Sequence, residues 1–134
     1  MILTPKTKKY IEEQIILYHA IVKEYGQLRE EILFESQSND ENQGGGKSNI
    51  PSRVIENRII RLENKKLQRL EKTIESIEVV YESLDDEKKK FWHMCFWQRR
   101  YTVDGLSYKF HISRATAFRW KNKMIIDVAK ELGY

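Results

Sequence analysis

Apolar residues recur every three or four positions through most of the chain, a spacing that predicts amphipathic α-helices. The first such stripe consists of Ile11, Ile15, Tyr18, Val22, Tyr25, Leu28 and Ile32. Thr4 followed by Pro5, or Thr7, suits the start of this helix, because a hydroxyl can cap free N–H groups and proline is tolerated in the first turn. We therefore predict one N-terminal helix within residues 1–34, weakened locally by Gly26.

Residues 35–50 interrupt this apolar pattern. They contain almost no apolar side chain and include three consecutive glycines. Burial therefore cannot offset the conformational entropy that ordering them would cost. We predict a flexible, polar and glycine-rich loop over this segment.

Residues 51–84 predict a long helix, because no glycine or proline follows Pro51 within this range. Its apolar positions form a heptad seam made by Leu67, Leu70, Ile74, Ile77, Tyr81 and Leu84. One small globular unit cannot cover a helix of this length. The seam is therefore expected to pack on the N-terminal helix as a hairpin, on a second copy of the chain as a coiled coil, or on both. We expect a homo-oligomer, with a dimer favoured.

Residues 85–134 predict a helix-turn-helix domain. Thr102 can cap a short helix with a buried face, and Ser113 can cap a second helix after a turn at residues 110–112. The small residues Gly105 and Ser107 are expected to let the second helix approach closely. The predicted core positions are Val103, Leu106, Phe110, Ile112, Ala117, Trp120 and Met124 or Ile125. The predicted fold is thus all-α, with a hairpin or coiled-coil arm followed by a C-terminal helix-turn-helix.

The charge of the chain is concentrated in this last segment. The 134 residues contain 24 Lys plus Arg and 20 Asp plus Glu, a net charge of +4. Residues 85–134 hold 11 basic and 6 acidic side chains, a net of +5, whereas residues 1–50 hold 6 and 8, a net of −2. A C-terminal unit this basic favours a polyanion such as nucleic acid as partner. A solvated helix surface is the alternative interpretation.

The exposed side of the second helix supplies candidate DNA contacts. Arginine can bond guanine edges bidentately, lysine neutralises phosphate, and small or aromatic side chains can meet thymine methyl groups. Hydroxyl groups and amides at the helix start suit phosphate oxygens. The predicted DNA-binding residues are Thr102, Ser113, Arg114, Ala115, Thr116, Phe118, Arg119, Asn122 and Lys123. We predict that the helix beginning at Ser113 enters the major groove of double-stranded DNA.

Other functional classes find little support in the residues. The single cysteine, Cys95, excludes a disulfide framework and a multi-cysteine zinc site. The three histidines, His19, His93 and His111, lack regular metal-ligand spacing. Because no carboxylate pair or nucleophile arrangement stands out either, we expect no enzyme, no cofactor and no metal.

The sequence also argues against membrane insertion and secretion. Its longest apolar stretch, residues 91–97, is interrupted by His93 and is too short to cross a bilayer. The N-terminal residues lack the pattern of a secretion signal. We therefore expect an intracellular protein.

Two stretches of the C-terminal segment resemble a known family. The sequence Ile112-Ser-Arg-Ala-Thr-Ala-Phe-Arg-Trp-Lys, followed by Ala129-Lys-Glu-Leu-Gly, resembles phage-encoded late-gene transcriptional activators of the RinA and ArpU type. More distantly, residues 84–124 resemble region four of bacterial sigma factors. The likeness to the phage regulators extends to the polar insert with three glycines, the long helix and Leu84-Asp-Asp-Glu-Lys-Lys-Lys-Phe.

This resemblance implies a transcriptional activator that binds DNA upstream of prophage late genes in the cytoplasm of a bacterial host. It implies double-stranded DNA as a partner and suggests host RNA polymerase as another. The helix-turn-helix positions that carry over are Ser113, Arg114, Ala115, Thr116, Phe118 and Arg119. Gly105 departs from the family pattern, which more often has a better helix former there.

Two alternatives stay open at the level of sequence. One is a DNA-packaging recognition subunit like a small phage terminase, which predicts a ring of many subunits. The other is a helical interaction protein with no DNA partner, which predicts no salt-dependent binding to any duplex.

Overall fold

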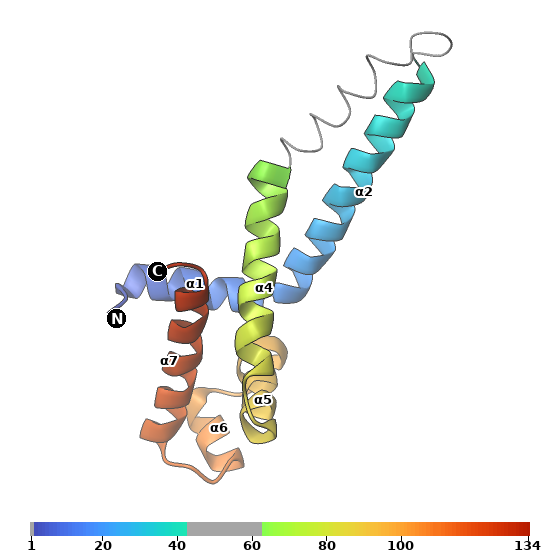
Figure 1. Cartoon of the computed structure of the whole chain (residues 1–134). Helices are drawn as coiled ribbons and strands as arrows, with labels where there is room; N and C mark the ends of the chain where they lie inside the picture. Colours follow the sequence, from blue (N-terminus) through green and yellow to red (C-terminus); the bar gives the residue numbers. More distant parts are fainter. Residues whose placement is uncertain (1, 43–62) are drawn as a thin grey trace. The chain divides into compact units, whose positions relative to one another are not determined.

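The computed structural model describes residues 2–42 and 63–134, and every regular element in these ranges is a helix (Figure 1). The prediction of an all-α protein is confirmed. The elements are α1 (Pro5–Ile16), α2 (Tyr18–Asn42), the π-helical η1 (Glu63–Leu67), α4 (Gln68–Glu82), α5 (Asp86–Trp92), the π-helical η2 (His93–Gln98), α6 (Val103–Lys109) and α7 (Arg114–Glu131). They belong to two compact units: residues 1–18 with 73–134, and residues 19–72.

The predicted single N-terminal helix is two helices, because the chain leaves helical geometry at Leu17. This residue has φ −87° and ψ 8°. The indole Nε1 of Trp97 donates a hydrogen bond to the Ile15 carbonyl oxygen at 3.0 Å. That oxygen would otherwise serve a continuing helix. The apolar stripe changes phase after the break, so Ile21 is 7% exposed whereas the predicted Val22 is 39% exposed.

Helix α2 continues to Asn42, so the predicted loop does not begin at residue 35. Residues 35–42 contain neither glycine nor proline, and their glutamate and glutamine residues are good helix formers. The rest of the predicted loop, residues 43–50, lies outside the described ranges. So do residues 51–62 of the predicted long helix.

The heptad seam lies on the buried side of the described part of that helix. Leu67 and Ile77 are buried, and the other four seam residues are half-buried. Helix α4 ends at Glu82, two residues before the predicted limit, and the Ser83 hydroxyl then donates to the Val80 carbonyl at 2.6 Å. In the unit of residues 19–72, Lys66 and Glu24 form an ion pair at 3.7 Å. Pairing of the seam in a hairpin or a coiled coil stays a prediction.

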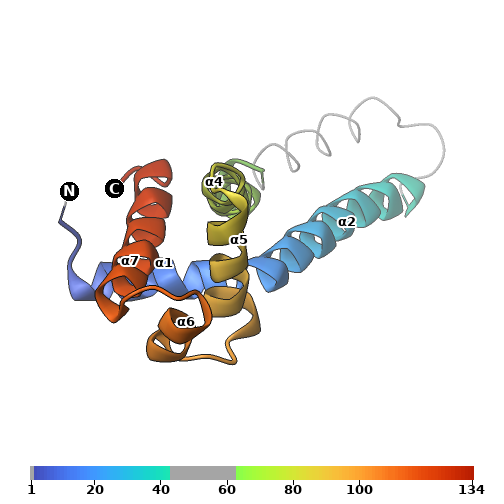
Figure 2. The ribbon, with the colours of Figure 1, turned by 90° about the horizontal axis from the view of Figure 1, so that it is seen from below.

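The core of the other unit is built around α5 and η2. Asp85 caps α5 by accepting the Lys88 N–H at 2.8 Å, and the helix then buries Phe91 and Trp92 completely. Phe96 of η2 is 1% exposed. These aromatic residues share one cluster with Ile11, Ile15, Ile77, Val80, Leu106, Ala117, Met124, Ile125, Val128 and Ala129. Helices α1, α6 and α7 therefore pack around one aromatic centre, with α1 crossing α7 (Figures 1 and 2).

The connection from α6 to α7 is defined by local hydrogen bonds. Thr102 Oγ1 accepts the Gly105 N–H at 3.1 Å at the start of α6. Ser113 Oγ accepts the Thr116 N–H at 3.0 Å at the start of α7. Between the helices, His111 has a left-handed φ of 56°. Both caps lie where the sequence places them.

Gly105 does not serve the close helix approach expected of it. A β-carbon at this position would lie 3.5 Å from Thr102 Oγ1 and 3.7 Å from Tyr101 Cβ, in ordinary van der Waals contact with the preceding loop. Ser107, in contrast, is 7% exposed, and its hydroxyl donates to the Asp104 carbonyl at 2.6 Å. Gly105 therefore faces its own helix start, and alanine would fit there.

The substitution His111→Gly should stabilise the chain by roughly 1 kcal/mol, because a β-carbon is strained in left-handed backbone and glycine is not. Urea unfolding followed by circular dichroism would show a higher midpoint with an unchanged slope. His111→Ala is the matched control, since it removes the imidazole but keeps the strained β-carbon. Equal midpoints for the two variants would contradict the prediction.

Candidate nucleic-acid interface

Helix α7 has one buried side and one exposed side. Ala117, Met124, Ile125 and Val128 face the core at 2% exposure or less. The predicted DNA-contacting residues lie mostly away from this side. Thr102, Ser113, Arg114, Ala115, Phe118, Arg119 and Lys123 are exposed, whereas Thr116 and Asn122 are half-buried. Eight of these nine belong to α7 or its cap, and Thr102 precedes α6.

A chain of hydrogen bonds connects Ser113, the cap of α7, to Arg119 in the second turn of the helix. The Ser113 hydroxyl donates to Thr116 Oγ1 at 2.9 Å, and Arg119 Nη2 donates to the same oxygen at 2.9 Å. The predicted phosphate-binding hydroxyls thus have structural partners already: Thr102 and Ser113 cap helices, and Thr116 orients an arginine. Ser113 and Thr116 thereby fix the position of Arg119.

Arg114 is held by two neighbours. Its Nε lies 2.7 Å from Asp104 Oδ1 of α6. Its guanidinium carbon also lies 5.4 Å from the centre of the Phe118 ring. Asp104 is not among the predicted site residues, although it is the one acidic residue among the ten basic side chains between Lys88 and Lys123. That isolation is the signal which could have identified it.

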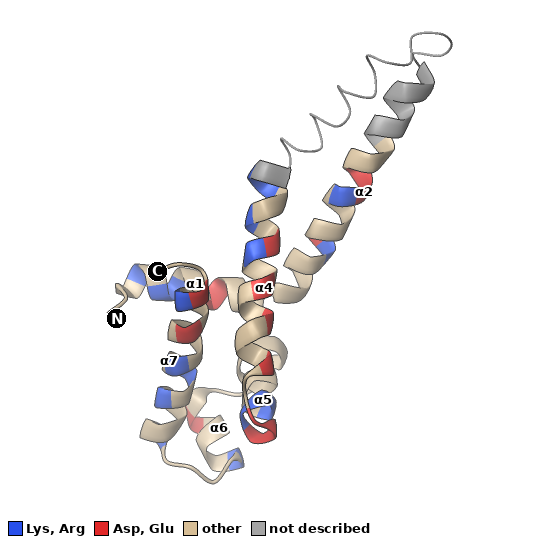
Figure 3. Cartoon of the chain, in the orientation of Figure 1, with Lys and Arg blue, Asp and Glu red and all other residues tan. Residues whose placement is uncertain are grey.

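Two further cations of α7 are paired with acids. Lys121 lies 3.3 Å from Glu12 of α1, and Lys123 lies 3.0 Å from Asp127 one turn further along α7. Helix α7 itself carries only basic charges up to Lys123, and its acidic residues, Asp127 and Glu131, follow towards its C-terminal end (Figure 3). Because of the two ion pairs, the local positive charge is smaller than the residue count indicates.

Basic side chains of α5 and α6 lie over aromatic rings. Lys88 Nζ is 5.4 Å from the Trp120 ring centre, and Lys109 Nζ is 5.3 Å from that of Tyr101. Trp120 also meets Phe91 edge to face, with ring centres 5.3 Å apart. Cations at such positions are attracted by the ring faces. These contacts place positive charge on the surface of α5 and α6.

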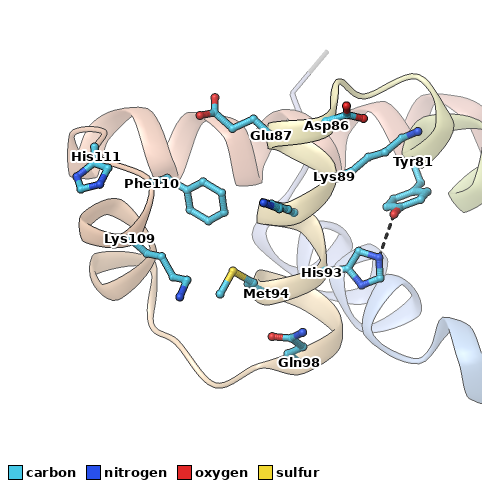
Figure 4. A pocket seen from close by; sticks show the side chains of 11 residues that line it. Tyr81, Asp86, Glu87, Lys89, His93, Met94, Gln98, Lys109, Phe110 and His111 are labelled. Carbon is cyan, nitrogen blue, oxygen red and sulfur yellow. Dashed lines mark hydrogen bonds between the residues drawn. The ribbon is translucent and has the colours of Figure 1, made fainter.

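A groove of about 850 Å³ lies between α5, η2 and the end of α6 (Figure 4). Met94 and Phe110 contribute apolar surface, and Lys89, Lys109, Asp86 and Glu87 contribute charges of both signs. His93 Nε2 lies 2.9 Å from the Tyr81 hydroxyl at its edge. Such mixed charge suits a polyanion less well than the exposed side of α7. In the ranges that the structure covers, no cluster of three or more potential metal ligands occurs.

Cys95 is half-buried on η2. Burial raises the pKa of its thiol to about 11, and the nearby Lys121 only partly opposes this effect. Because the thiolate is the reactive form, this environment disfavours a nucleophilic role. The geometry agrees with a small packing residue.

Comparison with known proteins identifies a family for this chain. The chain matches DUF722, described as a protein of unknown function, over residues 6–130. It belongs to the DUF722 family. The match runs from α1 through nearly all of α7. No match was found among curated proteins or among solved structures. Within residues 2–42 and 63–134 of this DUF722 protein, no helix has the length and apolar character needed to cross a membrane.

Trp120→Ala should destabilise the protein by about 2–3 kcal/mol, below the roughly 3–5 kcal/mol typical of a fully buried tryptophan. The reason is that Trp120 is half-buried, and its ring still supports Phe91 and Lys88. Urea denaturation measures the change. Tyr108→Ala is the control, because Tyr108 is 82% exposed, and its effect should stay within about 0.5 kcal/mol. Equal stability of the two variants would contradict this packing.

Cys95 in the native protein should react with a thiol-specific disulfide reagent at least ~10 times more slowly than in urea-unfolded protein at pH 8. Its native pKa of about 11 leaves little thiolate at that pH. The native rate should rise with pH until it levels near the pKa. Equal native and unfolded rates would show an accessible thiol of ordinary pKa.

Proposed function

We propose that this DUF722 protein is a sequence-specific, double-stranded DNA-binding transcriptional regulator. In this proposal α6 and α7 form a helix-turn-helix, and α7 enters the major groove. The observation that carries it is the exposed side of α7, where Arg114 and Arg119 are each held by a neighbouring side chain at the start of a serine-capped helix. The proposed role is binding rather than catalysis.

The physical fit of α7 to DNA supports this role. The major groove of B-DNA is wide enough for one α-helix, and the N-terminal part of a recognition helix meets the base edges. Arg114 and Arg119 lie in the first two turns of α7. Ala115 and Phe118 on the same side suit thymine methyl groups, and Lys123 suits a phosphate. Helix α6 would then cross the DNA backbone.

The resemblance of residues 112–121 to phage late-gene activators supports a more specific role. We propose activation of prophage late genes in the cytoplasm of a bacterial host, with host RNA polymerase as a second partner. The heptad spacing of the seam over residues 67–84 is the support for a proposed homodimer. A two-fold dimer would bind two half-sites about one helical turn apart or a multiple of it.

The first test is selection from a library of randomised duplexes, followed by titration of the selected duplex against an unrelated one at several salt concentrations. We expect one preferred sequence, bound tighter than competitor by ~10³ or more. Weak binding to all duplexes that disappears with salt would contradict sequence-specific regulation. A ring of many subunits on a packaging-start site would favour the terminase-like role instead.

Arg119→Ala should weaken binding to the selected duplex by about 1–3 kcal/mol and relax the preference at one base pair. Lys123→Ala is the control from the same side of α7. It should weaken binding to all duplexes alike and lower the slope of log affinity against log salt by about 1. Equal losses on selected and unrelated duplexes would show that Arg119 contacts phosphate and not a base.

A further inference from the structure

The ion pair between Arg114 and Asp104 joins the two helices of the proposed DNA-binding motif. Asp104 lies in the first turn of α6, and Arg114 is the first residue of α7. Their side chains are 56% and 70% exposed, so the pair lies on the surface. An exposed ion pair contributes little to folding stability. A contribution to folding stability therefore does not explain why this ion pair is present.

The contact engages one particular edge of the guanidinium. Asp104 Oδ1 lies 2.7 Å from Arg114 Nε, so the carboxylate meets the side of the group. The Phe118 ring lies 5.4 Å from the guanidinium carbon and supports it further. The terminal Nη1–Nη2 edge points away from the Nε contact by the fixed geometry of the group. This edge can donate two parallel hydrogen bonds.

Guanine presents the acceptors that match this edge. Its O6 and N7 atoms lie side by side in the major groove, and bidentate arginine is the commonest specific contact to them. A flexible arginine would lose side-chain entropy on forming such a contact. An arginine already held by a carboxylate and a ring loses less.

A carboxylate at this place has an electrostatic cost for DNA binding. In the proposed complex, Asp104 would face the negatively charged DNA backbone, so its charge would lower the affinity for every duplex. The same charge holds Arg114, the cation that would contact a base. Asp104 thus favours discrimination over affinity.

We infer that Asp104 is a positioning residue that holds Arg114 for bidentate contact with a guanine, and thereby sets a preference for guanine at one base pair of the recognised sequence. This inference rests on the proposed DNA-binding function. Arg114 makes the contact, and Asp104 acts through it.

The experiment compares Asp104→Ala with Asp127→Ala, using the full chain and duplexes selected with the wild-type protein. Asp127 pairs with Lys123 at 3.0 Å on the same helix. Each substitution removes one negative charge and releases one cation, so both should raise affinity for unrelated duplexes. The Arg114→Ala variant identifies the base pair that Arg114 contacts. It is the position at which wild-type protein prefers guanine and this variant does not.

We expect wild-type protein to prefer guanine at that position by about tenfold or more. Asp104→Ala should reduce this preference at least about threefold, whereas Asp127→Ala should leave it unchanged. In the Arg114→Ala background, adding Asp104→Ala should change base preference no further. Asp104→Asn, which keeps an oxygen acceptor, should retain part of the preference and serves if the alanine variant fails to fold.

The outcomes separate this inference from the proposed function. If wild-type protein selects no sequence, the proposed function fails. If it selects a sequence but Arg114→Ala changes no guanine preference, the inference alone fails. An unchanged preference in both Asp104 variants, or an equal loss in Asp127→Ala, would likewise overturn the role of Asp104.

Discussion

The burial of Phe91, Trp92 and Phe96 is the interaction on which the unit of residues 1–18 and 73–134 depends. These three side chains are at most 1% exposed, and they form one cluster with residues of α1, α6 and α7. Trp92 acts here as apolar volume, because its buried Nε1 has no hydrogen-bond partner among residues 2–42 and 63–134. Once this centre fixes which side of α7 is buried, the opposite side is fixed too. Packing of the core therefore determines which residues of α7 form the candidate interface.

Local signals in the sequence were sufficient for the starts of α1, α6 and α7. Thr4, Thr102 and Ser113 each accept a backbone N–H three residues ahead, so the cap and its partner are close in the chain. The break at Leu17 could not be predicted in this way. It accompanies a hydrogen bond from Trp97, which is 82 residues from Ile15 in sequence. A prediction from periodicity alone therefore extended one helix through Leu17. It placed Val22 on the buried side, where the structure has Ile21.

The candidate site was predictable in outline but not in its contacts. The 3.6-residue period of α7 separates its buried side from its exposed side, so most of the proposed DNA contacts are indeed exposed. The pairing of Arg114 with Asp104 and of Lys121 with Glu12 depends on how separate helices pack. Charge counts cannot show which cations are neutralised. Nor can they show that Thr116 binds Arg119 and leaves its hydroxyl less available to phosphate.

The unit of residues 1–18 and 73–134 combines two stretches of chain that are far apart in sequence, and this affects how it folds during synthesis. Ile11 and Ile15 of α1 are 0% exposed, in a cluster whose other members begin at residue 77. Translation proceeds from the N-terminus at roughly 5–20 residues per second. The apolar side of α1 is therefore made early and must wait for α5, η2 and α7 to leave the ribosome. Until then, its two buried isoleucines are a surface that chaperones can recognise.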